Sequence, residues 1–187
     1  RTRHLAGNLL VALAALAAAW PSAARAAAPA VSFEVLHTFR NTDGAAPMAR
    51  LIVGSDGNLY GVTKFGGEAG ADAGSVFRLA PIGGLATLHE FSQADGRAPE
   101  AGLAQAGDGR LYGTTTAGGA AAAGTAFRLS PSGSPAFQTL VPFDVPTGVS
   151  PFAGLTQASD GNFYGTTIEG GDFLAGTVYR LTPAGAM

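Results

Sequence analysis

Short runs of alternating apolar and polar residues, separated by segments rich in glycine, proline and aspartate, recur along most of this chain. In its middle part, four such runs span residues 101–107, 110–116, 125–130 and 136–143. Each run has the length of a β-strand, and in the third run Phe127 and Leu129 alternate with small or polar residues. No run after residue 30 keeps a helical period over the 11 or more residues that an amphipathic helix needs. The pattern therefore predicts an all-β chain.

This strand pattern repeats at a fixed interval. The hexapeptides DGNLYG, DGRLYG and DGNFYG begin at residues 56, 108 and 160, so the step is 52 residues in both cases. Other positions keep the same step: Phe39, Phe91 and Phe143; Gly44, Gly96 and Gly148; Pro47, Pro99 and Pro151; Leu51, Leu103 and Leu155. Length differences fall in glycine-rich connectors, which is how loops between strands behave. Three repeats therefore occupy approximately residues 33–84, 85–136 and 137–187.

Four strands in about 52 residues is the pattern of a β-propeller blade. We therefore expect residues 27–187 to form a β-propeller-type repeat region with three four-stranded antiparallel blades. A parallel β-helix is the structural alternative, although its coils usually need far fewer residues. Three blades are fewer than the four to eight of a closed propeller. We expect the chain to be part of a larger ring, because it opens on Arg1 rather than Met; the alternative is that several chains share one ring.

The two ends of the repeat region complement each other. Residues 31–39 resemble the fourth strand of a repeat but precede the first complete repeat, whereas the chain ends on a third strand, residues 176–181. The N-terminal strand could therefore complete the last blade, which would hide two sheet edges at once. If three blades are the full length, self-association is expected.

The first residues are typical of a secretory signal peptide. Arg1 and Arg3 precede an uncharged apolar run at 9–20, and the triplet 24–26, Ala-Arg-Ala, fits cleavage after Ala26. The run is shorter than the 18 or more residues of a membrane span; an uncleaved N-terminal anchor is the alternative. We expect residues 1–26 to be a signal peptide, and the mature protein to be secreted, periplasmic or at the cell surface of a bacterium, with no membrane span.

Charge and composition exclude several partners. Residues 1–26 contain 3 of the 11 basic residues and none of the 13 acidic ones, so the mature chain has a net charge near −5. Nucleic-acid binding needs a basic patch, and anionic membrane surfaces attract basic segments, so neither partner is expected. The chain contains no cysteine, which excludes a cysteine nucleophile, a thiolate metal site and a redox pair.

The units DGNLYGVTKFGG…GSVFRLAP, DGRLYGTTTAGG…GTAFRLSP and DGNFYGTTIEGG…GTVYRLTP resemble the Gloeo/Verruco (GloVer) tandem-repeat family of bacterial exported proteins. The resemblance covers approximately residues 31–185 and rests on three copies. It implies a propeller-type extracytoplasmic protein, in a family whose members often carry many repeats and in some cases a C-terminal cell-surface sorting tail. It implies no particular activity. The sequence departs from the pattern at Val62-Thr63, where the other units have two threonines.

The hexapeptide has a structural interpretation. An Asp-Gly pair between two strands predicts a hairpin with a type I′ turn, which requires positive φ at both central residues. Calcium binding is the alternative for the repeated carboxylate, but calcium needs six to eight oxygen ligands and each turn offers one Asp. The tyrosines are expected to pack between blades, and the glycines that follow them to allow close approach of a neighbouring strand. The repeated structural positions are Asp56, Gly57, Tyr60, Asp108, Gly109, Tyr112, Asp160, Gly161 and Tyr164.

Two further residue types recur in the repeats. Arg78, Arg128 and Arg180 lie within third strands, and we expect them to pair with the turn carboxylates. Histidine occurs in the motif LHxF at residues 37 and 89, but the third repeat has Val141 instead, so a metal or general-base site built on one histidine per repeat would be incomplete. No catalytic triad, cofactor site or metal site is predicted.

The double-glycine connectors vary from repeat to repeat and are the predicted ligand face. In propellers these connectors and the segments between blades usually share one face, whereas the Asp-Gly turns would lie on the other. The candidate ligand-face residues are Lys64, Glu68, Asp72, Glu169, Asp172 and Phe173. We expect a secreted, non-catalytic binding or cell-surface module for an extracellular glycan or protein. The alternatives are an extracytoplasmic propeller hydrolase or lyase that uses the loop carboxylates, and a purely structural segment of a longer surface protein.

Overall fold

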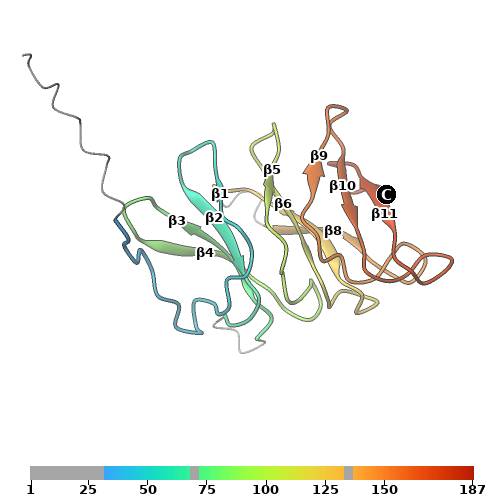
Figure 1. Cartoon of the computed structure of the whole chain (residues 1–187), viewed down its shortest axis with the longest axis horizontal. Coiled ribbons are helices and arrows are strands. Elements are labelled where there is room, and N and C mark those ends of the chain that lie inside the picture. The colour runs from blue at the N-terminus through green and yellow to red at the C-terminus, as the bar shows by residue number, and fades with distance from the viewer. Residues whose placement is uncertain (1–31, 68–71, 133–136) are drawn as a thin grey trace, which may run out of the picture. The chain divides into compact units, whose positions relative to one another are not determined.

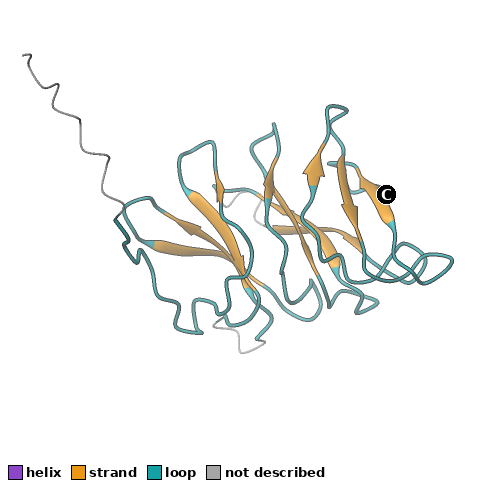
Figure 2. Cartoon of the chain, viewed as in Figure 1, coloured by secondary structure: helices purple, strands orange, loops and turns teal. Residues whose placement is uncertain are grey.

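The computed structural model describes residues 32–67, 72–132 and 137–187. Residues 35–187 form one structural unit. The predicted signal peptide, its cleavage site and Glu68 lie outside the described residues. Every strand belongs to the unit 35–187, and the described part of the chain is all β (Figure 1; Figure 2). It contains no helix with the length and hydrophobicity of a membrane span.

Within the described residues, eleven strands form three antiparallel sheets, one for each repeat. Sheet 1 has the order β1-β2-β3-β4, with strands Ile52–Val53, Leu59–Thr63, Ser75–Leu79 and Leu85–Glu90. Sheet 2 has the order β5-β6-β7-β8, with strands Ala104–Gln105, Leu111–Thr115, Thr125–Leu129 and Phe137–Pro142. Sheet 3 has the order β11-β10-β9, in which β11 is Val178–Leu181, β10 is Phe163–Thr166 and β9 is Thr156–Gln157. The all-β class and the repeated antiparallel sheets are confirmed.

The predicted strand pattern needs two corrections. The first strand of each repeat is only two residues long, because the chain enters the Asp-Gly hairpin directly afterwards. Residues 32–40 form no strand, and sheet 3 contains three strands within the described residues. The predicted completion of sheet 3 by this segment is therefore not found among the described residues. Instead, the Phe39 ring packs edge-on against Phe77 of sheet 1 at a centroid distance of 5.2 Å.

Aromatic side chains fill the space between consecutive sheets. One core cluster joins sheets 1 and 2 and contains Tyr60, Val76, Phe91 and Phe127. A second cluster joins sheets 2 and 3, and in it the rings of Tyr112 and Phe163 lie 4.3 Å apart. Tyr60 and Tyr112 are fully buried, as the sequence predicted for packing between repeats, whereas Tyr164 is only half-buried because no described sheet follows sheet 3.

The glycine after each tyrosine makes room for a ring of the neighbouring strand. Gly61 is opposite Phe77 in the register of β2 and β3, and a Cβ on Gly61 would lie 2.5 Å from Cζ of Phe77. Gly113 has the same relationship with Phe127, and Gly165 with Tyr179. The predicted close approach is therefore confirmed, and it is made by an aromatic ring that lies over the glycine.

Sheet 3 shows how much each sheet depends on the elements beside it. Val76 of β3 and Ala126 of β7 are both 0 % exposed, whereas the equivalent Val178 of β11 is 80 % exposed. Sheets 1 and 2 have a fourth strand beside this position, but β11 is the edge of its sheet in the described structure. In sheets 1 and 2 the fourth strand and the following sheet together bury this position, and sheet 3 has neither among the described residues.

Candidate functional site

The Asp-Gly hairpins and the double-glycine loops lie at opposite ends of the sheets. In Figure 1 the tips of the β1–β2, β5–β6 and β9–β10 hairpins project on one side of the sheets, which we call the turn face. The double-glycine loops lie on the other side, which we call the loop face. There each loop pairs with the segment that enters its repeat, through the bridges Ala45–Phe65, Arg97–Ala117 and Val149–Glu169.

On the turn face, each aspartate is held by residues of its own hairpin. In repeat 1, Oδ1 of Asp56 accepts a 3.1 Å hydrogen bond from the Asn58 amide, and Oδ2 accepts bonds of 2.7 Å from both the Asn58 side chain and the Tyr60 hydroxyl. The tyrosine hydroxyls of the other repeats donate to Asp108 and Asp160 at 3.1 and 2.9 Å. Both oxygens of Asp56 are thus used inside the hairpin, which favours the turn interpretation over calcium binding.

The turn type differs from the type I′ expectation. Gly57 has a φ of 79°, but Asp56 is not among the residues with positive φ. The amide of Gly57 bonds to the carbonyl of Gly54 at 2.9 Å, and the amide of Gly54 bonds to the carbonyl of Asn58 at 2.8 Å. This is a type I turn followed by a glycine in the left-handed region, a common longer hairpin connection. Asp56 can then keep ordinary backbone angles and use its side chain as a cap.

These hydrogen bonds change the acidity of both partners. The hydrogen bond from Tyr60, followed by that from Asn58, lowers the pKa of Asp56 to about 2. Burial, followed by the bond to Asp56, raises the pKa of Tyr60 to about 12. Each shift favours a carboxylate paired with a neutral phenol, so neither group is prepared to exchange a proton near neutral pH.

The predicted pairing of arginines with the turn carboxylates is not found. Within the described residues, the ion pairs include none between Arg78, Arg128 or Arg180 and these aspartates. Arg78 and Asp56 line one open cavity of about 370 Å³ without pairing. Arg128 donates from Nε and Nη2 to Gln138 at 3.1 and 2.8 Å, and from Nη1 to the carbonyl of Pro183 at 2.7 Å. The tyrosine hydroxyls take the place that we expected for arginine.

The histidines have a local partner that the sequence reasoning missed. His37 contacts Asp43 at 2.9 Å, and His89 contacts Asp95 at 3.0 Å. Both aspartates also accept a backbone amide three residues earlier, at 2.7 Å. In repeat 3 the histidine is Val141, the aspartate position is Thr147, and Asp144 and Thr147 cap each other across the same turn. Histidine and aspartate are replaced together in repeat 3, which indicates that the pair caps a structural turn. The six-residue spacing from histidine to aspartate could have revealed this pair in the sequence.

A pair of hydroxyl groups, buried in repeats 1 and 2 and partly buried in repeat 3, also recurs in every repeat. Oγ1 of Thr115 lies 2.9 Å from Oγ1 of Thr125 and accepts the Thr125 amide at 3.0 Å. The pairs Thr63–Ser75 and Thr167–Thr177 have the same 2.9 Å separation. Thr63 therefore keeps the repeat pattern, and the departure in repeat 1 is confined to Val62. The repeat spacing of Thr63, Thr115 and Thr167 could have revealed this pair.

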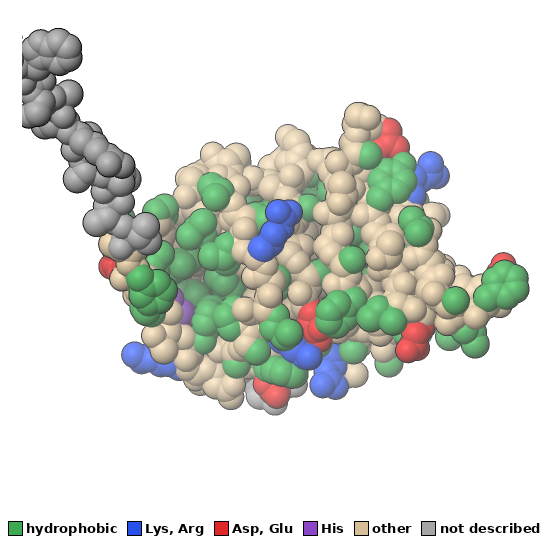
Figure 3. Space-filling model, viewed as in Figure 1, with side chains coloured by type: hydrophobic (Ala, Val, Ile, Leu, Met, Phe, Trp, Pro, Cys, Tyr) green, Lys and Arg blue, Asp and Glu red, His purple; other side chains and the backbone are tan. Residues whose placement is uncertain are grey.

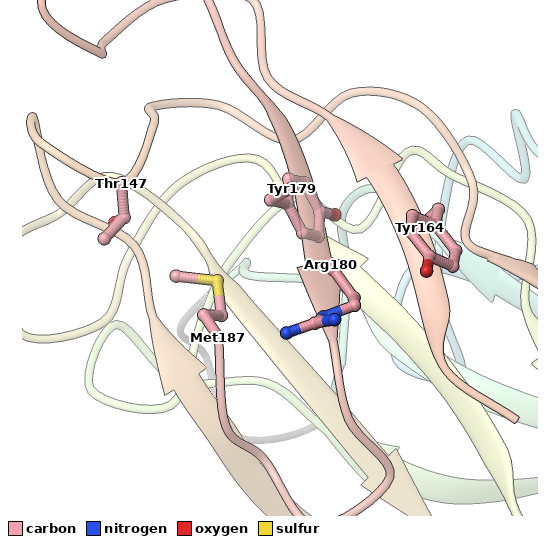
Figure 4. A pocket seen from close by; sticks show the side chains of 5 residues that line it. All are labelled: Thr147, Tyr164, Tyr179, Arg180 and Met187. Carbon is pink, nitrogen blue, oxygen red and sulfur yellow. The ribbon is translucent and has the colours of Figure 1, made fainter. Parts of the chain in front are cut away.

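Repeat 3 has one orphan polar group beside a cavity. Tyr179 stands where the other repeats have Phe77 and Phe127, and its buried hydroxyl has no hydrogen-bond partner among the described residues. Burial raises the pKa of Tyr179 well above its ordinary value. Figure 4 shows Tyr179 and Arg180 on β11 beside Tyr164, with Thr147 and Met187 completing an open cavity of about 510 Å³.

Two of the predicted loop-face residues bind within the scaffold. Lys64 forms a 2.8 Å ion pair with Glu100 of the next repeat, and its ammonium lies 5.0 Å from the centre of the Phe65 ring. Asp72 accepts a 2.7 Å hydrogen bond from the amide of Gly66 and has a positive φ of 46°. These contacts give both residues a structural role in connecting and shaping the loop. Glu68 lies outside the described residues.

The other three predicted residues gather on one loop. Glu169, Asp172 and Phe173 are exposed on the double-glycine loop of repeat 3, and Phe173 is 92 % exposed. Ile168 and Leu174 add further exposed apolar surface. In the space-filling view, apolar and acidic side chains occur together where this loop projects at the right-hand end (Figure 3). The corresponding loop of repeat 2 carries four alanines, Ala120–Ala123.

The architecture and its repeated contacts define a class, an all-β tandem-repeat protein in which each unit is one antiparallel sheet packed on the next. The chain belongs to the Gloeobacter/Verrucomicrobia repeat family, whose model matches residues 25–187. None of the curated proteins matches the chain. Among the described residues, no group of three or more histidine, aspartate or glutamate side chains is arranged to hold a metal ion.

Proposed function

We propose that this protein is an exported, non-catalytic binding or cell-surface module, and that its ligand contacts the loop face. Three features support the proposal. The turn-face side chains are occupied by hydrogen bonds within their own hairpins, the scaffold is nearly the same in each repeat, and the side chains of the loop face differ. Loops on a rigid scaffold are the usual place of recognition.

The proposed assembly is a β-propeller in which each sheet is one blade of a larger ring. The packing of each sheet on the next supports it, as does the exposed edge of β11, which leaves room for further strands or for another chain. The N-terminal sequence features support export, with residues 1–26 as a cleaved signal peptide.

The observation that carries the proposed function is the exposed loop of repeat 3. Phe173 is 92 % exposed, so its ring buries little surface within the described chain, but it can stack on the apolar face of a sugar or hold an apolar side chain of a protein. Glu169 and Asp172 lie close to it in the sequence and can accept hydrogen bonds from ligand hydroxyl or amide groups. An extracellular glycan fits this combination, and a protein is the alternative ligand.

The hydrolase or lyase alternative would use the same two carboxylates. A general acid of this kind requires a pKa raised by burial or by a like charge. Glu169 and Asp172 are both exposed. Their surroundings therefore favour recognition over proton transfer.

The test is a binding screen of the purified protein against glycans and extracellular proteins, together with hydrolysis assays on generic ester and glycoside substrates. We expect a ligand whose binding is weakened by Phe173→Ala and also by Glu169→Gln or Asp172→Asn. Ile82→Ala is the matched control, because Ile82 is 97 % exposed in the β3–β4 turn, outside the loop face. Turnover abolished by Glu169→Gln or Asp172→Asn would overturn the proposal in favour of the enzyme.

A further inference from the structure

A third concave surface lies at the segments that lead into the first strand of each sheet. Residues from segments 49–50, 100–103 and 152–156 line one cavity of about 390 Å³, which we call the inter-repeat groove. Its volume lies within the range of small-ligand sites. All three repeats contribute, so the groove exists only after the sheets have packed together.

The segments that form this groove vary at two positions. The segments that form it read PMARL, PEAGL and PFAGL, at 47–51, 99–103 and 151–155. Proline, alanine and leucine are the same in all three, whereas the second and fourth positions differ in character. The second positions are Met48, Glu100 and Phe152, and the fourth are Arg50, Gly102 and Gly154. A constant backbone therefore presents a cation, an acid and an aromatic ring, each only once.

The glycines keep the floor of the groove open. A Cβ on Gly102 would lie 3.3 Å from Cγ of Arg50, and a Cβ on Gly154 would lie 3.3 Å from the carbonyl oxygen of Gly102. The arginine stem thus passes over the next repeat at a position where any larger residue would compete for its space. A glycine floor also brings backbone polar groups within reach of a ligand.

The groove has a positive charge that its own residues do not neutralise. Glu100 is bound to Lys64 at 2.8 Å, so these two charges balance each other. Arg50 takes part in none of the ion pairs within the described residues. A guanidinium group binds carboxylates through two parallel hydrogen bonds, which makes a carboxylate its natural ligand.

We propose that the inter-repeat groove binds a carboxylate-bearing sugar, and hence an acidic glycan. Arg50 receives the carboxylate, the half-exposed ring of Phe152 stacks on the apolar face of the sugar, and the hydroxyl of Thr156 together with the glycine backbone bonds to sugar hydroxyls. This inference rests on the proposed binding function, and it adds a ligand class and a place of contact separate from the Phe173 loop.

The experiment compares two oligosaccharides that differ only in the carboxylate. A galacturonic acid trimer and a galactose trimer of the same linkage are titrated by calorimetry into the protein, purified from a bacterial host after any processing. We expect the acidic trimer to bind at least about tenfold more tightly than the neutral one at low salt, with the difference shrinking as salt is added. Equal binding of both trimers, or binding of neither, would overturn the proposal.

Two variants and one control assign the site. Arg50→Gln should remove the preference for the acidic trimer, a loss of about tenfold, whereas Phe152→Ala should weaken both trimers. Arg110→Gln is the control, because Arg110 lies on the turn face and pairs with Asp108 at 3.3 Å. An unchanged preference in Arg50→Gln, or an equal loss in Arg110→Gln, would show that the groove is not the site. Binding that depends on Phe173 but not on Arg50 would leave the proposed function standing and reject this inference alone.

Discussion

The hydroxyl of Tyr60 donates a 2.7 Å hydrogen bond to Oδ2 of Asp56, four residues earlier in the same hairpin. The tyrosine ring is buried between sheets 1 and 2 while the aspartate caps an exposed turn, so one bond connects the core to the turn face. The bond recurs in repeats 2 and 3. It explains why an acid and an aromatic residue keep the same spacing in every repeat.

Loss of this hydrogen bond should change how the protein responds to acid. The folded-state pKa of Asp56, about 2, lies below the unfolded value near 3.9, so its contribution is fully present above about pH 4. That contribution is lost as the pH falls toward 2. In Tyr60→Phe, we expect the Asp56 pKa, measured by carboxyl NMR titration, to rise toward its ordinary value. An unchanged pKa would show that Asn58 alone holds the carboxylate.

Gly113→Ala should destabilise the fold, because the new Cβ would lie 2.5 Å from Cζ of Phe127 and 2.9 Å from Cδ2 of Leu103, both buried. Overpacking of this kind costs about 1–3 kcal/mol of unfolding free energy. Gly107→Ala is the matched control, since its Cβ would meet no atom within 4 Å, and we expect it to change stability by less than about 0.5 kcal/mol. Urea denaturation measures both variants, and equal effects would contradict the packing argument.

Thr115→Val should cost about 1–3 kcal/mol of stability, because it removes the acceptor of the buried Thr125 amide and the partner of its hydroxyl. Thr166→Val is the control: Thr166 is exposed in repeat 3, and repeat 1 carries Val62 at the equivalent position. We expect the control to stay within about 0.5 kcal/mol of the parent chain in thermal or urea unfolding. A loss of stability in Thr115→Val as small as that of the control would show that the hydroxyl pair contributes little.

His89 should make the fold sensitive to weak acid. Burial lowers the pKa of His89, against the opposing effects of Asp95 and Glu90. A folded pKa below the unfolded value near 6.5 means that the full contribution is present above about pH 6.5 and is lost as the pH falls. His89→Val should flatten the decline of unfolding free energy between about pH 6.5 and 5, although it also removes the ring stacked on Phe137 at 3.6 Å. If the unfolding free energy declined equally steeply in both proteins, the decline would come from the titration of other groups.

Much of the fold could be predicted because the three copies of the repeat can be aligned with one another, which shows the positions that stay the same. The strands around Tyr112 and Phe127 were evident from alternation and from three aligned copies. The turn type was not, since type I and type I′ hairpins both accept Asp-Gly and only the backbone angles of Asp56 distinguish them. The partner of Asp56 was also missed, because Arg78 and Tyr60 both suit a carboxylate and only the side-chain directions decide between them.

The candidate site was predicted less completely, because the sequence does not show which side chains are in contact in the folded chain. Exposed Phe173 and Glu169 could be selected as residues that differ between repeats. Lys64 and Asp72 could be selected in the same way, but their contacts with Glu100 and Gly66 occupy them in the scaffold. The inter-repeat groove went unnoticed, because Arg50, Gly102 and Phe152 are far apart along the chain.

By itself, the sequence determined the period, the strands, the hairpin positions and the repeat family, because these depend on local alternation and on residues such as Gly57 that few others can replace. Only the tertiary structure decided which polar groups are used and which remain free. The hydrogen bonds from Asn58 and Tyr60 to Asp56 and the ring over Gly61 lie within one repeat, but they depend on side-chain directions that only the folded sheet sets. The exposure of Val178 depends on what packs beside sheet 3, and no single repeat contains that information.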